Sequence, residues 1–446
     1  MSRTNRTPFP KLFWLVVVFE FFERASYYGM MSVFSVYCTD ILGFAKADVG
    51  LIKGTIQPLL YFLPIISGAI ADRFGYRRTL MVAFALLGMG YFLTSQATDY
   101  ALVFLSLVVM GLGAGTFKPV ISGTIARCTD ETNSTLGFGI FYWSINLGAF
   151  LAPLLLVPYL KQNLGWDWVI IAAALGTSAM LIPTLLFYRE PPRKEPAKKD
   201  QTSLWTTLTK AFEIIYSPLV ILFSKKPDAR FRDHAKFLLM IFIYSGFWVM
   251  YFQMFDSVLW YVQDYVDAGP LDAAVNLVLA ALGISFEWHF DVEHVTAINA
   301  GVIIMLQLFI SNIVKNTRAM PTMIIGIAVG TAGMAILAVS ANIWVFIAGI
   351  TLFSVGEMTA HPKFISYVGQ TAPQDKVAMY MGYLFLYGVI GSGIGGILGA
   401  NMYVHFVDEL NQPATLWLIF AGIGAATIVG LLLYDRAFGE RGDTST

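Results

Sequence analysis

This sequence has little charge. Asp, Glu, Lys and Arg make up only 13% of its 446 residues, whereas a soluble domain carries about 25%. Hydrophobic residues make up 57%, and the mean hydropathy is +0.65. The formal net charge is zero, which excludes the basic field expected of a nucleic-acid-binding protein. We therefore expect an integral membrane protein with no nucleic-acid partner.

The sequence also lacks the residue patterns of enzymes. Its two cysteines, Cys38 and Cys128, are too few for a disulfide framework and have no metal-site spacing. There is no glycine-rich phosphate loop and no nucleophile elbow. The run 289–294 contains His, Asp and Glu, but at no recognised ligand spacing. We expect no enzymatic activity, no cofactor and no metal.

Long apolar runs are abundant instead. A helix needs roughly 20 apolar residues to cross a bilayer, and the short basic start (Arg3, Arg6, Lys11) leads directly into a full-length run, so we expect no cleavable signal peptide. The hydropathy predicts twelve spans, at 12–38, 49–71, 79–97, 100–125, 136–158, 167–188, 237–263, 296–315, 321–340, 342–370, 377–403 and 413–434.

The break after the sixth span predicts an all-α protein in two halves. We expect an N-terminal six-helix bundle at 1–188, a linker at 189–236 and a C-terminal six-helix bundle at 237–446. Within the linker, 204–223 is moderately apolar but contains charge, which favours an amphipathic helix at the membrane surface over a span. The apolar stretch 271–285 is too short to span and predicts an outer hairpin or cap.

Loop charges predict the orientation. The linker is rich in lysine and arginine, whereas 264–295 has neither and carries several acids, Glu293 among them. The positive-inside rule places the linker and the basic loop 72–78 in the cytoplasm and 264–295 outside. An even number of spans then puts both termini in the cytoplasm, with the chain in a cell membrane.

The first span contains three charges, Glu20, Glu23 and Arg24, followed by Tyr27 and Tyr28. Ionisable groups at membrane depth are costly and face a protein interior or a cavity. Glu20 and Arg24 are i,i+4 neighbours, so one helix face is charged and phenolic. Two interpretations remain open, an ion or substrate pathway and a structural ion pair that locks helices together.

Two further charges lie in opposite halves. Lys118 is deep in the fourth span, and Glu357 is midway along the tenth, one turn before His361. A buried charge needs a partner, so we expect Lys118 and Glu357 to meet at the midplane, where a two-half transporter binds its substrate. The alternative is a permanent clasp between the halves.

Uncharged polar residues and glycines also occur inside the spans. Each polar side chain is expected to make a helix-packing hydrogen bond rather than to bind a ligand, and the glycines to allow close helix contacts. The polar residues are Tyr61, Asn146, Tyr244, Gln253, Asn299, Gln307 and Tyr367, and the glycines are Gly111, Gly113, Gly115, Gly391, Gly395 and Gly399.

Several motifs resemble a known family. The segment 68–78, GAIADRFGYRR, resembles the loop between the second and third helices of the major facilitator superfamily. Glu20-x-x-Glu23-Arg24 with Tyr-Tyr-Gly resembles the first-helix motif of the proton-dependent oligopeptide transporters. The segment 141–148, FYWSINLG, resembles that family's fifth-helix signature, and Phe-Lys118-Pro and Gly-Glu357 match its fourth and tenth helices.

The resemblance implies the major facilitator fold, with twelve transmembrane helices in two six-helix bundles, and symport of di- or tripeptides with protons by alternating access. Proton coupling would involve Glu20, Glu23, Arg24 and Glu357, with His361 a weaker candidate. We expect the chain to work as a monomer, with short peptides, protons and the lipid bilayer as its partners. The peptide would be bound by Arg24, Tyr27, Tyr28, Tyr61, Lys118, Asn146, Asn299 and Glu357.

Three positions depart from the family pattern. Met31 stands where an arginine is usual, Phe252-Gln253 where a glutamate is usual, and Leu384 where a tryptophan is usual. In the family, the arginine and the glutamate that are replaced at the first two positions pair across the outer gate. Because both are absent here, neither charge is left buried without a partner. These departures keep two alternatives open, the same fold carrying a non-peptide metabolite or acting as an uncoupled or export transporter, and a transport-dead membrane sensor.

Overall fold

The computed structural model describes residues 8–130, 132–191, 229–371 and 383–438. Over these ranges the chain is almost entirely helical, with a single isolated β-bridge between Asp267 and Asn342. Ten helical segments among these residues are long and apolar enough to cross a membrane. α1 (Lys11–Val36) is 26 residues long and carries the three charges of the first span. The predicted all-α membrane architecture is therefore confirmed.

The chain divides into two compact units, each described here by itself. Unit 1 comprises Met1–Phe212 with Val292–Ile304, and unit 2 comprises Glu213–Asp291 with Met305–Thr446. The division at 1–188, 189–236 and 237–446 stays a prediction. The amphipathic helix expected at 204–223 lies outside the described residues.

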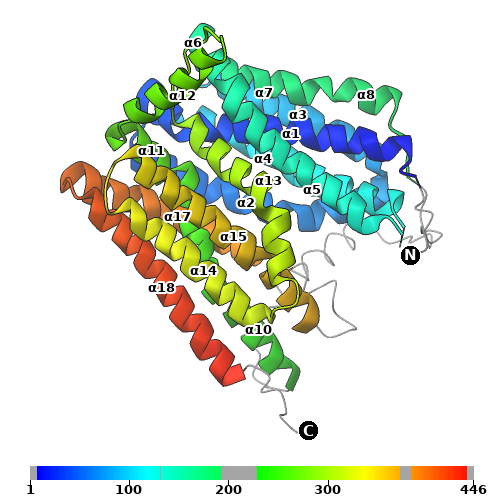
Figure 1. Cartoon of the computed structure of the whole chain (residues 1–446). Helices are drawn as coiled ribbons and strands as arrows, with labels where there is room; N and C mark the ends of the chain where they lie inside the picture. The colour runs from blue at the N-terminus through cyan, green and yellow to red at the C-terminus, as the bar shows by residue number, and fades with distance from the viewer. Residues whose placement is uncertain (1–7, 131, 192–228, 372–382, 439–446) are drawn as a thin grey trace. The chain divides into compact units, whose positions relative to one another are not determined.

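In unit 1, α1 packs against α5 and α7, and α3 packs against α4 (Figure 1). α5, a π-helical segment and α6 continue one another as one span, as do α7 and α8. The elements after α1 are a π-helical segment (Tyr37–Ile41), α2 (Lys46–Phe74), α3 (Tyr76–Gln96), α4 (Tyr100–Cys128), α5 (Ser134–Leu151), a second π-helical segment (Ala152–Leu156), α6 (Val157–Asn163), α7 (Asp167–Ala179) and α8 (Leu181–Leu186).

In unit 2, α14 packs against α15 and α18, and α10 packs against α17 (Figure 1). The helix α13 begins with residues of unit 1 and ends in unit 2. The elements are α10 (Ala229–Phe252), a 3₁₀ turn (Gln253–Phe255), α11 (Ser257–Tyr265), α12 (Gly269–Ala281), α13 (Glu293–Val314), α14 (Ala319–Leu337), α15 (Ile343–Thr371), α17 (Leu386–Tyr403), a π-helical segment (Val404–Glu409) and α18 (Pro413–Phe438).

Glycines allow the close helix contacts that the sequence predicts. A Cβ atom on Gly391 would lie 2.5 Å from the Cβ of Trp248, and one on Gly395 would lie 3.1 Å from the carbonyl oxygen of Val249. These distances are shorter than van der Waals contact, so only glycine lets α17 approach α10 this closely. In unit 1, a Cβ on Gly113 would lie 2.7 Å from the backbone nitrogen of Leu87.

The seventh span is broken, which the sequence analysis did not predict. The expected helix 237–263 divides into α10 and α11 at Asp256, whose φ of −133° and ψ of −93° are not helical. Gln253 occupies the break and donates from its side chain to the carbonyl oxygens of Val249 (2.9 Å) and Gly395 (3.0 Å). This confirms Gln253 as a helix-packing residue. The stretch 271–285 is partly occupied by the short helix α12.

Candidate functional site

The charged face of α1 is buried inside unit 1. Glu20, Glu23 and Arg24 are 4%, 0% and 7% exposed. The Arg24 guanidinium lies between the two acids, with Nε 3.5 Å from Oε1 of Glu20 and with a hydrogen-bonded ion pair to Oε2 of Glu23. One cation thus compensates two carboxylates that have left water, and a further positive charge is needed for balance.

Aromatic rings continue this face by one helical turn. The guanidinium carbon of Arg24 lies 5.2 Å from the ring centre of Tyr27 and 6.0 Å from that of Tyr28. Cations are attracted to aromatic faces at such distances. The hydroxyl of Tyr27 donates to Oε1 of Gln57 on α2 at 3.0 Å. Tyr27 therefore connects the charged face of α1 to a polar position on α2.

Lys118 supplies the second positive charge. It lies close enough to Glu20, Glu23 and Arg24 to interact with their charges, and its Nζ is 5.3 Å from the ring centre of Tyr61 on α2. Two acids and two bases give this group a formal charge of zero. Protonation of either acid would make the group positive and would favour an incoming carboxylate.

A proline explains the local form of α4 at Lys118. Pro119 has no N–H, so the carbonyl of Gly115, four residues earlier, loses its usual helical donor. The hydroxyl of Ser67 on α2 donates to this carbonyl oxygen instead, at 2.6 Å. The sequence Phe-Lys118-Pro therefore fixes α4 to α2 next to the lysine.

The fifth-helix signature 141–148 packs on α1. A Cβ on Gly148 would lie 2.8 Å from the carbonyl oxygen of Phe21, so glycine permits close contact with the helix that bears the charges. Asn146 is buried and its Nδ2 donates to the carbonyl oxygen of Tyr142, one turn earlier, at 3.0 Å. Asn299 is carried by the part of α13 that belongs to unit 1.

The two candidate proton-coupling residues of unit 2, Glu357 and His361, lie next to a cluster of aromatic rings. Glu357 is on α15 and interacts electrostatically with Tyr244 on α10. The hydroxyl of Tyr244 is 3.3 Å from Nδ1 of His361, and the rings of Trp248 and Tyr387 lie 5.0 Å and 5.3 Å from the His361 ring. His361 is thus held among aromatic rings. The pairing of Lys118 with Glu357 stays a prediction, because the two belong to different units.

The departures from the family pattern are buried apolar positions. Met31, Phe252 and Leu384 are 4%, 5% and 5% exposed. Met31 lines a void of about 10 Å³ together with Tyr27 and Lys53. All three side chains are apolar and buried, so a charged residue placed at any of these positions would need a partner.

Several buried charges lie outside the predicted site. Lys53 on α2 is buried and its Nζ donates to the Ser35 hydroxyl at 2.9 Å. Asp256 is buried at the break of the seventh span. Glu293, an acid of the predicted outer loop 264–295, is the first residue of α13 and is 0% exposed. The sequence could have indicated Asp256 in one way, because it is an acid inside the predicted span 237–263.

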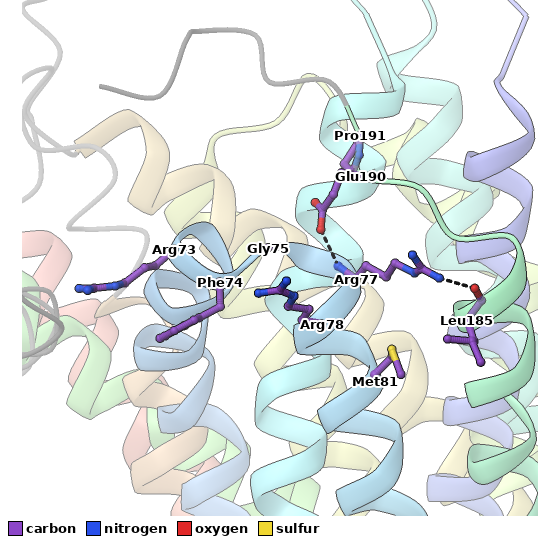
Figure 2. Close-up of a pocket in the computed structure, with 9 residues that line it drawn as sticks. All are labelled: Arg73, Phe74, Gly75, Arg77, Arg78, Met81, Leu185, Glu190 and Pro191. Atoms are coloured by element: carbon purple, nitrogen blue, oxygen red, sulfur yellow. Dashed lines mark hydrogen bonds between the residues drawn. The ribbon is translucent and has the colours of Figure 1, made fainter. Parts of the chain in front are cut away.

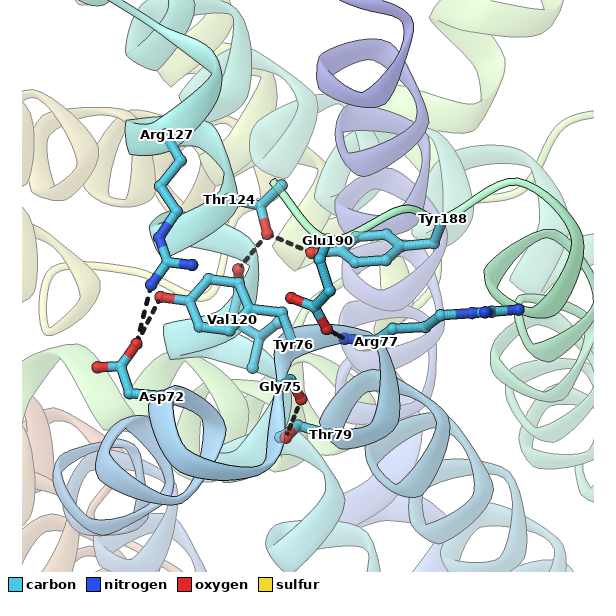
Figure 3. Close-up of polar contacts among 10 residues, drawn as sticks. All are labelled: Asp72, Gly75, Tyr76, Arg77, Thr79, Val120, Thr124, Arg127, Tyr188 and Glu190. Atoms are coloured by element: carbon cyan, nitrogen blue, oxygen red, sulfur yellow. Dashed lines mark hydrogen bonds and ion pairs between the residues drawn. The ribbon is translucent and has the colours of Figure 1, made fainter. Parts of the chain in front are cut away.

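The loop between α2 and α3 is held by polar contacts (Figure 3). Asp72 accepts from Nη2 of Arg127 at 2.9 Å and from the hydroxyl of Tyr76 at 3.2 Å. The Arg127 guanidinium carbon lies 4.0 Å from the Tyr76 ring centre. Glu190 accepts from the backbone N–H of Arg77 at 2.9 Å. These contacts tie the α2–α3 loop to the end of α4 and to the segment after α8.

Tyr188 completes this group of contacts. Its hydroxyl is 2.7 Å from that of Thr124 on α4. The pKa of Tyr188 is raised above its usual value of 10.0, and the largest cause of this increase is burial of the phenol. The phenol therefore stays neutral across the physiological range and keeps its hydrogen bond.

A surface pocket of about 690 Å³ lies next to the same loop (Figure 2). Arg73, Arg77 and Arg78 are among the residues that line it. In Figure 2 the side chain of Arg77 extends toward the end of α8, where its guanidinium donates to the carbonyl oxygen of Leu185. None of the predicted substrate-binding residues lines this pocket, so we do not assign it to the transport site.

Gly75 makes a testable contribution to this loop. Its φ is +92°, and a Cβ there would lie 2.8 Å from Oε1 of Glu190. Strained backbone of this kind costs about 1–3 kcal/mol, so Gly75→Ala is expected to lower the midpoint of thermal unfolding in detergent by several degrees. Gly139→Ala is the matched control, since Gly139 has open space around its Cβ position and lies inside helix α5. An equal effect of the two changes would contradict the prediction.

The chain is similar to known membrane transporters. Residues 14–292 match the family model of the Major Facilitator Superfamily. Dipeptide and tripeptide permease A of Escherichia coli (strain K12) is 26% identical over 472 residues, covering 94% of this chain and 90% of that protein. The predicted resemblance is thereby confirmed at the level of sequence.

Solved structures agree in fold. A crystal structure of the peptide transporter POT in complex with sulfate has a TM-score of 0.75 and 20% identity, covering 95% of this chain and 94% of that one. A POT family transporter in complex with 5-aminolevulinic acid has a TM-score of 0.73 and 22% identity, with 95% of each chain covered. At these identities the likeness shows the fold, and the predicted twelve-helix arrangement is compatible with it.

Proposed function

This chain belongs to the major facilitator superfamily, and we propose that it is a secondary active transporter that moves di- and tripeptides together with protons by alternating access. The observation that carries this proposal is the buried ionic group of Glu20, Glu23 and Arg24, with the half-buried Lys118 near enough to interact with their charges. Ionisable groups at membrane depth mark substrate and proton pathways. The permease names of the relatives support short peptides as the substrate.

The chemistry of a peptide matches the charges available. Its carboxylate would bind to Arg24 and Lys118, and its amino group to Glu357. Asn146 and Asn299 would bind backbone groups, while Tyr27, Tyr28 and Tyr61 would line the site. Protons would act through Glu20, Glu23 and Glu357, because protonating an acid in a neutral group leaves a net positive charge for the peptide carboxylate.

We further propose that the chain works as a monomer in a cell membrane, with both termini in the cytoplasm. The excess of lysine and arginine in the linker and the absence of both from 264–295 support this orientation. We propose transport without catalysis, with no cofactor.

The test is uptake of dialanine into proteoliposomes, with and without an inward proton gradient. Accumulation that a protonophore abolishes is the expected result, and it would show that coupling operates without charges at Met31 and Phe252. Downhill flux alone would mean an uncoupled transporter. Binding without flux would support a membrane sensor and contradict transport.

A second candidate is a non-peptide substrate on the same fold. The specific observation that favours it is Leu384, which is 5% exposed where the family resemblance expects a tryptophan. A screen of amino acids and small carboxylates in the same proteoliposomes separates the two, since only the peptide hypothesis requires dialanine to compete with the transported compound.

Lys118 gives a sharper test of peptide recognition. Lys118→Gln removes a charged hydrogen-bond donor worth about 1.5–3 kcal/mol, so the apparent affinity for dialanine is expected to fall about 10- to 100-fold. The affinity for dialanine amide, which has no carboxylate, should change much less. Competition against a labelled substrate measures both. An equal loss for the two compounds would show that Lys118 is a structural clasp.

A further inference from the structure

Lys161 and Glu293 form a buried ion pair in unit 1. Nζ of Lys161 lies 2.7 Å from Oε2 of Glu293, and the two side chains are 7% and 0% exposed. The ammonium also lies 4.8 Å from the ring centre of Trp166. A pair of this kind differs from a surface pair, because removing one member leaves a charge in a low-dielectric site.

The pair is at the end of two predicted spans. Lys161 is on α6, at the end of the fifth span, and Glu293 begins α13, the eighth. The charge of the loops assigns both ends to the outside of the membrane. Eight residues after Glu293, a Cβ on Gly301 would lie 3.0 Å from the ring of Phe150 on α5. The ion pair and this glycine contact together hold the first turns of α13 to α5 and α6.

α13 is a continuous helix that two compact units share. Its residues up to Ile304 belong to unit 1, and its residues from Met305 onward belong to unit 2. Any opening at the outer end that moves the first turns of α13 must therefore either bend this helix or separate Lys161 from Glu293. A helix is stiff over a few turns in the absence of proline or a glycine pair, so release at the ion pair is the simpler route.

We propose that Lys161 and Glu293 are positioning residues for transport, which hold the outer part of α13, and with it Asn299, while the outer side is closed and separate when it opens. This proposal rests on the alternating access of the proposed function. A buried ion pair suits a reversible contact because its Coulomb gain and its desolvation cost nearly cancel. Opening to water is thus less costly than it would be for an apolar contact of equal size.

A covalent link tests whether the pair must open. In a C38A/C128A background, the variant K161C/E293C is joined with a short bis-methanethiosulfonate reagent, which forms a reducible disulfide with each thiol and releases methanesulfinate. Dialanine uptake is measured before linking, after linking and after reduction with a thiol. We expect linking to lower uptake at least tenfold and reduction to restore it. Parental uptake after complete linking would overturn the proposal, because a permanent structural pair never needs to separate.

The control link joins H405C and E409C. These positions are exposed i,i+4 neighbours whose side chains are 2.9 Å apart within one helical segment, so a link between them constrains no movement between elements. Its uptake is expected to be unchanged by the same reagent. Loss of uptake there as well would overturn the interpretation of the first link.

Thiol labelling gives a readout that needs no substrate. Thr296 is buried one turn after Glu293. The variant T296C, in the same C38A/C128A background, is treated with a membrane-impermeant thiol reagent, and the rate of labelling is measured. The neutral pair K161M/E293Q should label several-fold faster than the parent, and the exchanged pair K161E/E293K should return to the parental rate. Lys315→Met, an exposed change at the other end of α13, should have no effect. Equal rates in all variants would overturn the proposal.

The two proposals fail in different ways. If the parent does not carry dialanine but the neutral pair labels faster, the substrate assignment is wrong and the gate stands. If dialanine is carried normally and the link has no effect, the gate is wrong and the transport function stands.

Discussion

Replacing Arg24 with glutamine is expected to reduce dialanine uptake to the background of empty liposomes. Arg24 lies between Glu20 and Glu23, and all three side chains are buried. Removing one partner of a buried ionic group costs about 3–5 kcal/mol, which is more than a hundredfold in binding or in the population of the competent state. Uptake per folded protein, with folding checked by thermal unfolding in detergent, measures the effect.

Two matched variants separate charge from geometry. Arg24→Lys keeps the charge but loses the planar fork that can reach two carboxylates, so we expect reduced but measurable uptake. E23Q/R24Q restores electrical balance and should unfold at a higher temperature than R24Q while remaining inactive. Arg436→Gln, an exposed change near the end of α18, should leave uptake unchanged. Parental uptake by R24Q would contradict a role for Arg24 in transport.

Replacing Glu357 with glutamine is expected to remove proton-driven accumulation while keeping exchange. Glutamine is nearly isosteric with a protonated glutamate, so the site should still bind and reorient with peptide. The glutamine cannot bind or release a proton, so the proton gradient can no longer drive transport through this position. We expect concentrative dialanine uptake to fall at least tenfold and counterflow to stay within about threefold of the parent.

The pH dependence of exchange supplies the control for Glu357→Gln. Counterflow is measured at matched internal and external pH over a range of values, in the parent and in E357Q. A glutamate that titrates during the cycle makes the parent sensitive to pH, and the variant should be less sensitive. A variant that still accumulates dialanine against its gradient would show that Glu357 does not couple protons to transport.

The helical spans and the charged face of α1 could be predicted from the sequence, because both depend on neighbours along the chain. A run of apolar residues must satisfy its backbone hydrogen bonds within itself once it is in lipid. The i,i+4 spacing of Glu20 and Arg24 places them together in any helix, and the structure gives 3.5 Å between them. The glycines of α17 likewise predicted a close contact between helices. They did not predict that α10 would be the helix in contact with α17.

The break of the seventh span could not be predicted in the same way. Residues 237–263 contain no proline, and their apolar run suggests one helix. The 3₁₀ turn at Gln253–Phe255 is held by a side-chain hydrogen bond from Gln253 to Gly395, which is 142 residues later in the chain. That contact exists only once α17 has packed against α10.

The sequence by itself determined the membrane class of this protein, its helices and the charge-bearing face of α1, since each follows from local spacing and from the cost of exposing peptide groups to lipid. The tertiary structure alone decided which distant charges leave water together. Lys161 and Glu293 each stand at the end of a span, where a solvated loop residue is the usual outcome. Their ion pair at 2.7 Å joins α6 to the start of α13, 132 residues later in the chain, and no local pattern encodes that contact.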